Sequence, residues 1–224
     1  MFTPGMGKIQ GMAKGVRRPR SKLSGHLELL THSLVTLARG KNVDTIIGSQ
    51  TIRSFVPLKS DLERSACGLY ATELVDRFTP EHVEDKPVFD LLEKTIEELC
   101  ASADCRMVLR RFELRLLGRV GYRPQLDTCV SCRQPVKPAG GYFCPGAGGL
   151  LCHDCQRLHS FSYPLSADTL DAMRSLQAED VVILPVSRSV SDELERVLKG
   201  YIKYLLDRDV KSAAWLEALK IQSL

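Results

Sequence analysis

Four cysteines in two Cys-x-x-Cys pairs constrain the fold of this chain more than any other feature. Cys129 and Cys132 form the first pair, Cys152 and Cys155 form the second, and nineteen residues rich in Gly and Pro separate the pairs. This spacing is typical of structural zinc, with each pair on a tight knuckle and the two knuckles closing a tetrahedron. The sequence therefore predicts one structural Zn²⁺ ion on four thiolates, with no position open to water or substrate.

Two other interpretations of these cysteines are ordinary buried thiols and a pair of disulfides. Cys144 lies between the pairs and could compete as a ligand, but we favour the two pairs because a knuckle needs both thiols three residues apart. His153, inside the second pair, is predicted to be a surface histidine. Eight cysteines with half of them in metal spacing favour a reducing cytoplasm. The remaining cysteines are predicted to be small buried hydrophobes: Cys67, Cys100 and Cys105.

Positive charge is concentrated at the start of the chain. Residues 1–60 carry ten Lys and Arg against two acidic residues, a net charge of +8, although the whole chain has a net charge of only +4. Such a basic lobe indicates a polyanionic partner, and nucleic acid is the commonest one. The alternative is a solvated charged loop.

The basic segment 13–22 contains Gly15 and Pro19 and lies between two predicted strands. Its side chains can follow a phosphate backbone without reading a base sequence. Only Phe2 and Phe55 are aromatic in the first 57 residues, which favours backbone contact over base stacking. The candidate nucleic-acid-binding residues are Lys8, Lys14, Arg17, Arg18, Arg20 and Lys22, with Arg39 and Lys41 as weaker candidates.

Hydrophobic periodicity predicts an α+β fold. Short strands at 8–16, 27–39 and 45–52, the second bent near residues 31–33, favour a small barrel or sandwich. Helical spacing follows, first up to the stop at Thr79-Pro80, then from Pro87, then from near Cys105 to Gly121. Beyond the cysteines, Ser166 is predicted to cap a short helix and Ser191 a longer one. No apolar run is long enough to span a bilayer, and no signal peptide is predicted.

The sequence gives no support for an enzyme. It contains no Walker loop, no G-x-G-x-x-G and no G-x-S-x-G. His82-Val83-Glu84 with the first cysteine pair superficially resembles the zinc deaminase signature. However, no Pro precedes Cys129, His82 is predicted to lie in a loop, and the second pair would have no role. We therefore predict a non-enzymatic binding protein.

Several collinear stretches resemble the bacterial recombination mediator family RecO. The run from Gly7-Lys8-Ile9 through Arg20-Ser21, then Leu27-Glu28-Leu29 and Ala38-Arg39-Gly40, resembles the family's N-terminal domain. The stretches 111–117 and 121–124 resemble the helix leading into its zinc module, and 148–152 resembles the approach to the second knuckle. The likeness covers most of residues 2–206 in order.

This resemblance implies an N-terminal oligonucleotide/oligosaccharide-binding (OB) fold at residues 1–57 and a helical domain at 58–224 with a zinc module at 125–160. It also implies binding of single- and double-stranded DNA, annealing of complementary strands, and loading of RecA together with RecR and the acidic tail of single-stranded-DNA-binding protein (SSB). The expected location is the bacterial cytoplasm, at the nucleoid.

The chain departs from the family pattern at its start. Family members have about two dozen further residues before Phe2-Thr3-Pro4, which supply the first barrel strand and part of the second. A start assigned too late, a truncation or an incomplete barrel would each explain this, and an incomplete barrel would expose a sheet edge. A zinc-ribbon protein that binds RNA or the ribosome is the alternative function.

Overall fold

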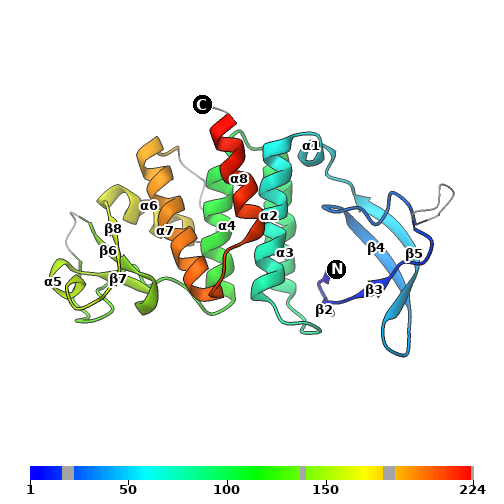
Figure 1. The fold of residues 1–224 in the computed structure, drawn as a ribbon, viewed down its shortest axis with the longest axis horizontal. Helices are drawn as coiled ribbons and strands as arrows, with labels where there is room; N and C mark the ends of the chain where they lie inside the picture. Colours follow the sequence, from blue (N-terminus) through cyan, green and yellow to red (C-terminus); the bar gives the residue numbers. More distant parts are fainter. Residues whose placement is uncertain (17–22, 137–139, 179–184, 223–224) are drawn as a thin grey trace. The chain divides into compact units, whose positions relative to one another are not determined.

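The computed structural model describes residues 1–16, 23–136, 140–178 and 185–222 (Figure 1). The chain forms two compact units, residues 1–101 and residues 102–224. The domain boundary after residue 57 stays a prediction. Among the described residues, no helix has both the length and the apolar character needed to cross a membrane.

The first unit begins with β-structure. A pair of short antiparallel strands precedes a three-stranded sheet of order β3-β5-β4, in which β3 is parallel and β4 antiparallel to β5 (Figure 1). The predicted small β-structure is thus confirmed, but the described strands form two separate sheets, so a closed OB barrel stays a prediction. The strands are β1 Phe2–Thr3, β2 Gly7–Lys8, β3 Gly11–Met12, β4 His32–Ala38 and β5 Asp44–Arg53.

Strand β4 starts five residues later than the sequence predicted. The residues before it form turns, and Leu30 has a left-handed φ of 52°, which is incompatible with a strand. The carbonyl of His26 accepts hydrogen bonds from the hydroxyls of Ser33 at 2.6 Å and Ser49 at 3.2 Å. These bonds hold the turn segment against the sheet, so its apolar residues do not continue the strand.

The predicted bend in β4 is confirmed. The pairing register with β5 shifts between His32 and Ser33. A second shift, between Thr36 and Leu37, places Ile47 of β5 between the partners of these two residues, and Ile47 is 62% exposed. Such bulges add local twist to a strand, which an alternation of period two does not reveal.

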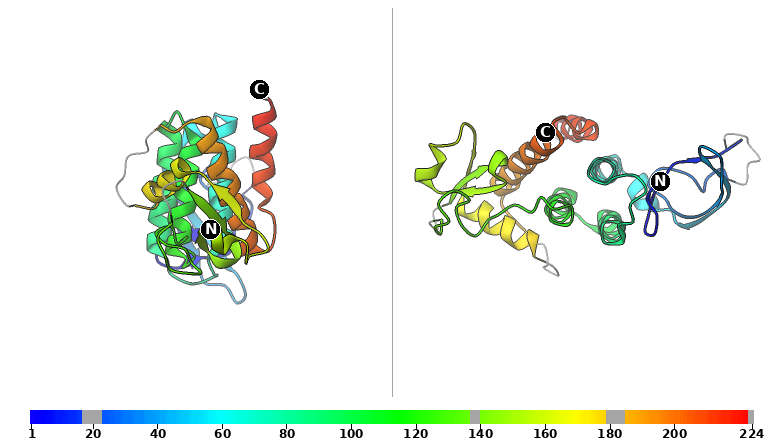
Figure 2. Two further views of the ribbon diagram at one scale, coloured as in Figure 1. Left: turned by 90° about the vertical axis from the view of Figure 1, so that its left-hand side faces the viewer. Right: turned by 90° about the horizontal axis from the view of Figure 1, so that it is seen from below.

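The two long helices predicted after the strands are confirmed as α2 and α3, which run side by side (Figure 2). Asp61 caps α2, because its side chain accepts a hydrogen bond from the Arg64 N–H at 2.9 Å. The helix ends where Thr79 becomes extended before Pro80. The helices of this unit are α1 Val56–Lys59, α2 Leu62–Phe78 and α3 Lys86–Ala101, and its fully buried side chains include Leu58, Leu74, Val88 and Leu99.

The second unit contains three mutually packed helices, α4 Cys105–Arg119, α6 Ala167–Gln177 and α7 Arg188–Leu206, followed by α8 Lys211–Gln222. The predicted cap of α6 is confirmed, because Ser166 accepts from the Thr169 N–H. The predicted cap of α7 is wrong. Ser187, not Ser191, caps the helix and accepts from the Val190 N–H at 3.4 Å. The apolar stripe begins one turn earlier than the sequence suggested, since Val190 is only 7% exposed.

A carboxylate joins the starts of α6 and α7. Glu193 of α7 accepts hydrogen bonds from the Ser166 N–H at 2.8 Å, the Ser166 hydroxyl at 2.7 Å and the Thr169 hydroxyl at 2.7 Å. Burial opposes ionisation of this carboxyl, but the hydrogen bonds from Ser166 and Thr169 outweigh it and lower the pKa of Glu193. The charged form of Glu193 therefore stabilises the folded unit.

Glu193→Gln should lower stability by about 1–3 kcal/mol at pH 7, because a neutral amide has one accepting oxygen in place of two and accepts weaker hydrogen bonds than a carboxylate. A carboxyl with a lowered folded pKa contributes fully above its unfolded pKa and loses the contribution as pH falls through the folded value. The difference in free energy of unfolding between the wild type and Glu193→Gln should therefore shrink below a pH of about 4.3. Thermal unfolding at pH 7 and below pH 4 measures this. Asp192→Asn, at an exposed neighbouring position on α7, is the control, and its Tm should differ little from that of the wild type at either pH.

Candidate metal centre and nucleic-acid surface

The four paired cysteines lie in a small module between α4 and α6. Its core is an antiparallel sheet of order β7-β6-β8. A 3-10 turn and a one-turn helix complete it. The elements are β6 Gly141–Cys144, η1 Pro145–Ala147, β7 Gly149–Leu151, α5 His153–Gln156 and β8 Tyr163–Leu165.

The first knuckle is a tight turn of the backbone. The Cys129 N–H donates to the Gln134 carbonyl, and the Arg133 N–H returns to the Cys129 carbonyl, both at 2.9 Å. Arg133 takes a left-handed φ of 62°, which reverses the chain directly after Cys132. The Val130 N–H donates to the Leu150 carbonyl at 2.8 Å, so this knuckle is fixed to strand β7.

The second knuckle forms where β7 passes into α5. Cys152 directly follows the strand and precedes the helix as its N-cap residue. The Gln156 N–H donates to the Cys152 carbonyl at 3.0 Å, which closes one helical turn and brings Cys155 to the same side as Cys152. Each pair is therefore positioned by a different local structure, a turn in one case and a helix start in the other.

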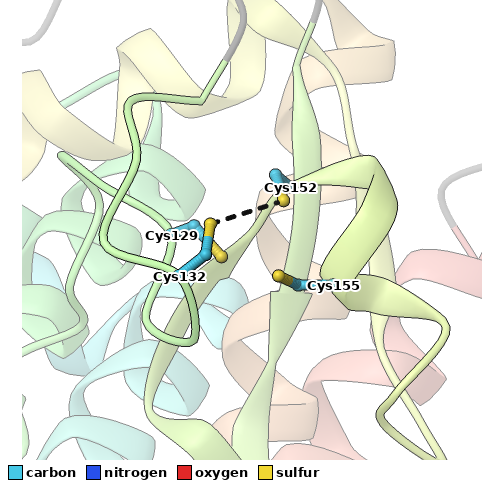
Figure 3. Close-up of side chains that lie close together, drawn as sticks. All are labelled: Cys129, Cys132, Cys152 and Cys155. Atoms are coloured by element: carbon cyan, nitrogen blue, oxygen red, sulfur yellow. Dashed lines mark hydrogen bonds between the residues drawn. The ribbon is translucent and has the colours of Figure 1, made fainter.

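The two knuckles bring the four sulfur atoms together (Figure 3). All four Sγ atoms lie within 4.8 Å of one another, and those of Cys132 and Cys152 are 3.8 Å apart. A tetrahedron with zinc–sulfur bonds of about 2.3 Å has edges of about 3.8 Å, so the spacing fits a zinc ion. Cys129 is buried, Cys132 is exposed, and Cys152 and Cys155 are half-buried.

The other interpretations of the cysteines are resolved by this geometry. All eight cysteines are free thiols, which excludes the disulfide interpretation for this structure. Cys144 is not in the four-sulfur group: it is buried in β6, with its Sγ 3.7 Å from His159 Nδ1. His153 is exposed, as predicted, and its Nδ1 lies 3.4 Å from the Tyr142 hydroxyl.

Two of the four thiols have strongly shifted pKa values. Burial opposes ionisation of Cys129, but backbone hydrogen bonds from Cys132, Cys152 and Ser131 outweigh it and lower the pKa to about 6. The hydrogen bond with Cys152 and burial raise the pKa of Cys155 to about 12. One thiol thus ionises readily while another resists, because hydrogen bonds favour the thiolate of Cys129 and the neutral thiol of Cys155. A divalent metal ion would compensate the charge of four thiolates.

The basic residues predicted to bind nucleic acid are only partly described. Lys14, Arg39 and Lys41 are exposed. Met12 of β3 and Ala38 of β4 both pair with Thr45 of β5, so Lys14 and Arg39 follow strands that meet at one position of the sheet. Arg17, Arg18, Arg20 and Lys22 lie outside the described residues.

Lys8 is less available for contact with a phosphate than the sequence suggested. Its ammonium group donates to the Asp76 carbonyl at 2.6 Å and lies 3.3 Å from the Asp76 carboxylate. The side chain is therefore engaged by α2. A count of basic residues in the N-terminal part carries no information on a partner sixty-eight residues away in sequence. The nucleic-acid surface as a whole stays a prediction.

The fold and the cysteine cluster together define an α+β protein with a four-cysteine module whose geometry fits a metal ion. The family model described as "Recombination protein O N terminal" matches residues 1–55, and the one described as "Recombination protein O C terminal" matches residues 59–214. The two matches cover nearly the whole chain. The chain therefore belongs to the RecO family, and the resemblance seen in the sequence is confirmed.

Curated relatives agree with the family models. DNA repair protein RecO of Dehalococcoides mccartyi (strain CBDB1) is 39% identical, over 100% of this chain and 89% of the relative. DNA repair protein RecO of Roseiflexus sp. (strain RS-1) is 37% identical, over 98% of this chain and 78% of the relative. The protein of the same name from Symbiobacterium thermophilum is 33% identical, over 98% of this chain and 89% of the relative.

Proposed function

We propose that this chain is a non-enzymatic mediator of DNA repair and recombination. It binds single- and double-stranded DNA, anneals complementary strands and, together with RecR, helps to load RecA onto single-stranded DNA covered by SSB. The observation that carries the proposal is membership of the RecO family across both of the family's domains. The proposed setting is the bacterial cytoplasm, at the nucleoid, with RecR and the acidic SSB tail as protein partners.

The basic N-terminal segment supplies the DNA contact in this proposal. Lys14 and the basic residues of 17–22 neutralise phosphates, with Arg39 and Lys41 as additional contacts, and neutralisation releases the counterions condensed on DNA. Contacts of this kind are independent of base sequence. Annealing follows, because two strands on a cationic surface lose much of the repulsion that keeps them apart.

The four-cysteine module has a structural role in this proposal. One Zn²⁺ ion would be held by Cys129, Cys132, Cys152 and Cys155, and four protein ligands fill its tetrahedral shell. What the ion supplies is positive charge and a cross-link between the two knuckles. The chain's own residues do the rest: the hydrogen bonds of the first knuckle fix it to β7, and α5 orients the second.

An annealing assay tests the proposed function. Two complementary oligonucleotides, one of them covered with SSB, should form duplex faster with the protein than without it, and faster at low than at high salt. A structured RNA of equal length should compete less well than single-stranded DNA. No acceleration at any salt would contradict the proposal, and stronger binding of the RNA would favour an RNA- or ribosome-associated function instead.

A further inference from the structure

One histidine outside the cysteine pairs connects the two knuckles. The Nε2 atom of His159 lies 2.9 Å from the Ser131 hydroxyl, inside the first knuckle. Its Nδ1 atom lies 3.7 Å from the Cys144 thiol, in strand β6. A neutral imidazole donates through one nitrogen and accepts through the other, and a hydroxyl and a thiol can each serve either role. The ring can therefore satisfy both contacts at once.

The backbone of His159 is tied to the second knuckle. The Leu158 N–H donates to the carbonyl of the ligand Cys155 at 3.0 Å, and the His159 N–H donates to the Gln156 carbonyl at 3.2 Å. These bonds continue the turn of α5 beyond its last residue. His159 therefore keeps a fixed place relative to Cys155, while its ring reaches the other knuckle.

Both contacts of the ring lead to the sulfur cluster. Ser131 lies between the ligands of the first knuckle, and its backbone N–H is hydrogen-bonded to the Cys129 sulfur. Cys144 packs with Cys129 and Leu151 in the buried cluster beneath the site. The imidazole thus spans the first knuckle, the sheet and the second knuckle without being a ligand itself.

We propose that His159 is a positioning residue for the metal centre, which keeps the first knuckle against the second and so slows release of the metal. This rests on the proposed binding of a metal ion by the four cysteines. Groups hydrogen-bonded directly to metal ligands typically contribute about 10–100-fold to metal affinity, and His159 acts one contact further out, through Ser131 and Cys144. His153 lies closer in sequence to the ligands, between Cys152 and Cys155, but its ring contacts Tyr142 and does not bridge the knuckles.

Zinc release to a chromogenic chelator tests this inference on the full chain. His159→Ala should release zinc up to about 10-fold faster than the wild type, the lower end of the range for groups bonded directly to a ligand. The matched control His153→Ala should release it at the wild-type rate. Ser131→Ala removes one of the two ring contacts and should show a smaller acceleration in the same direction. Because His159 and Ser131 act through one contact, the double variant should release zinc no faster than His159→Ala.

A melting experiment separates positioning from a general packing role. His159→Ala should lower the Tm of the zinc-loaded protein but have little effect in a Cys132→Ser background, where the centre is already broken. An equal loss of Tm in both backgrounds would overturn the proposal. Zinc release at the wild-type rate in His159→Ala would also overturn it. If His159→Ala does not fold, release at the wild-type rate in Ser131→Ala would overturn it. A wild-type protein that binds no zinc would instead contradict the metal centre itself.

Discussion

Cys132→Ser should release the bound zinc and lower the Tm by roughly 6–12 °C, while single-stranded DNA binding changes less than about twofold. Serine does not ionise at neutral pH, so the centre loses one of its four thiolates. A structural zinc contributes about 10–16 kcal/mol in isolated zinc peptides. Loss of only about 3 kcal/mol, at about 2–4 °C per kcal/mol for a chain of this length, produces the stated shift.

Metal content, thermal unfolding and an oligonucleotide titration measure the three parts of this expectation. Cys100→Ser is the control, because Cys100 is a half-buried thiol on α3 and not part of the sulfur cluster. This variant should retain one zinc ion per chain. A Cys132→Ser protein that kept its zinc would contradict the four-thiolate centre, and one that lost DNA binding while remaining folded would move the DNA contact toward the module.

Arg17/Arg18/Arg20→Ala should weaken single-stranded DNA binding by about 100-fold at 0.1 M monovalent salt. Each phosphate contact on a single strand contributes about 0.7 to the slope of log K against log salt, so three lost contacts reduce the magnitude of that slope by about 2. Because these contacts carry no base information, the loss should be similar for different oligonucleotide sequences. Fluorescence anisotropy at four or five salt concentrations measures both quantities.

A charge-matched variant separates local contact from net charge. Arg188/Arg196/Arg208→Ala removes three exposed arginines from the second unit and changes the net charge equally. It should leave the salt slope near the wild-type value. Equal losses in the two variants would show that the long-range field of the protein, and not contact with the segment 17–22, determines affinity.

The features that sequence predicted well are those set by neighbouring residues. A Cys-x-x-Cys pair needs only a local turn, so both knuckles and their grouping followed from spacing. The C-terminal end of α2 and the cap of α6 were likewise predictable, because Thr79-Pro80 and Ser166 act on the adjacent turn.

Features set by contacts between residues far apart in the sequence could not be predicted from the sequence. Ser191 resembled a cap as closely as Ser187 did, and the start of α7 is shown by the Ser187 cap together with the burial of Val190. Arg110 and Glu113 lie one turn apart on α4 and form an ion pair at 3.1 Å, but their burial, with only 5% and 0% exposed, depends on what covers the helix. His159 was not among the residues predicted from the sequence, although its position four residues after the last ligand was a usable signal.

The most direct test of the central claim, that the N-terminal basic segment binds DNA while the metal module only stabilises the fold, compares three proteins in one experiment. The salt dependence of single-stranded oligonucleotide binding is measured for the wild type, Arg17/Arg18/Arg20→Ala and Cys132→Ser, at a temperature where all three are folded. We expect the slope to fall by about 2 in the arginine variant and to stay at the wild-type value in the cysteine variant. An unchanged slope in the arginine variant, or a reduced slope in the cysteine variant, would contradict the claim.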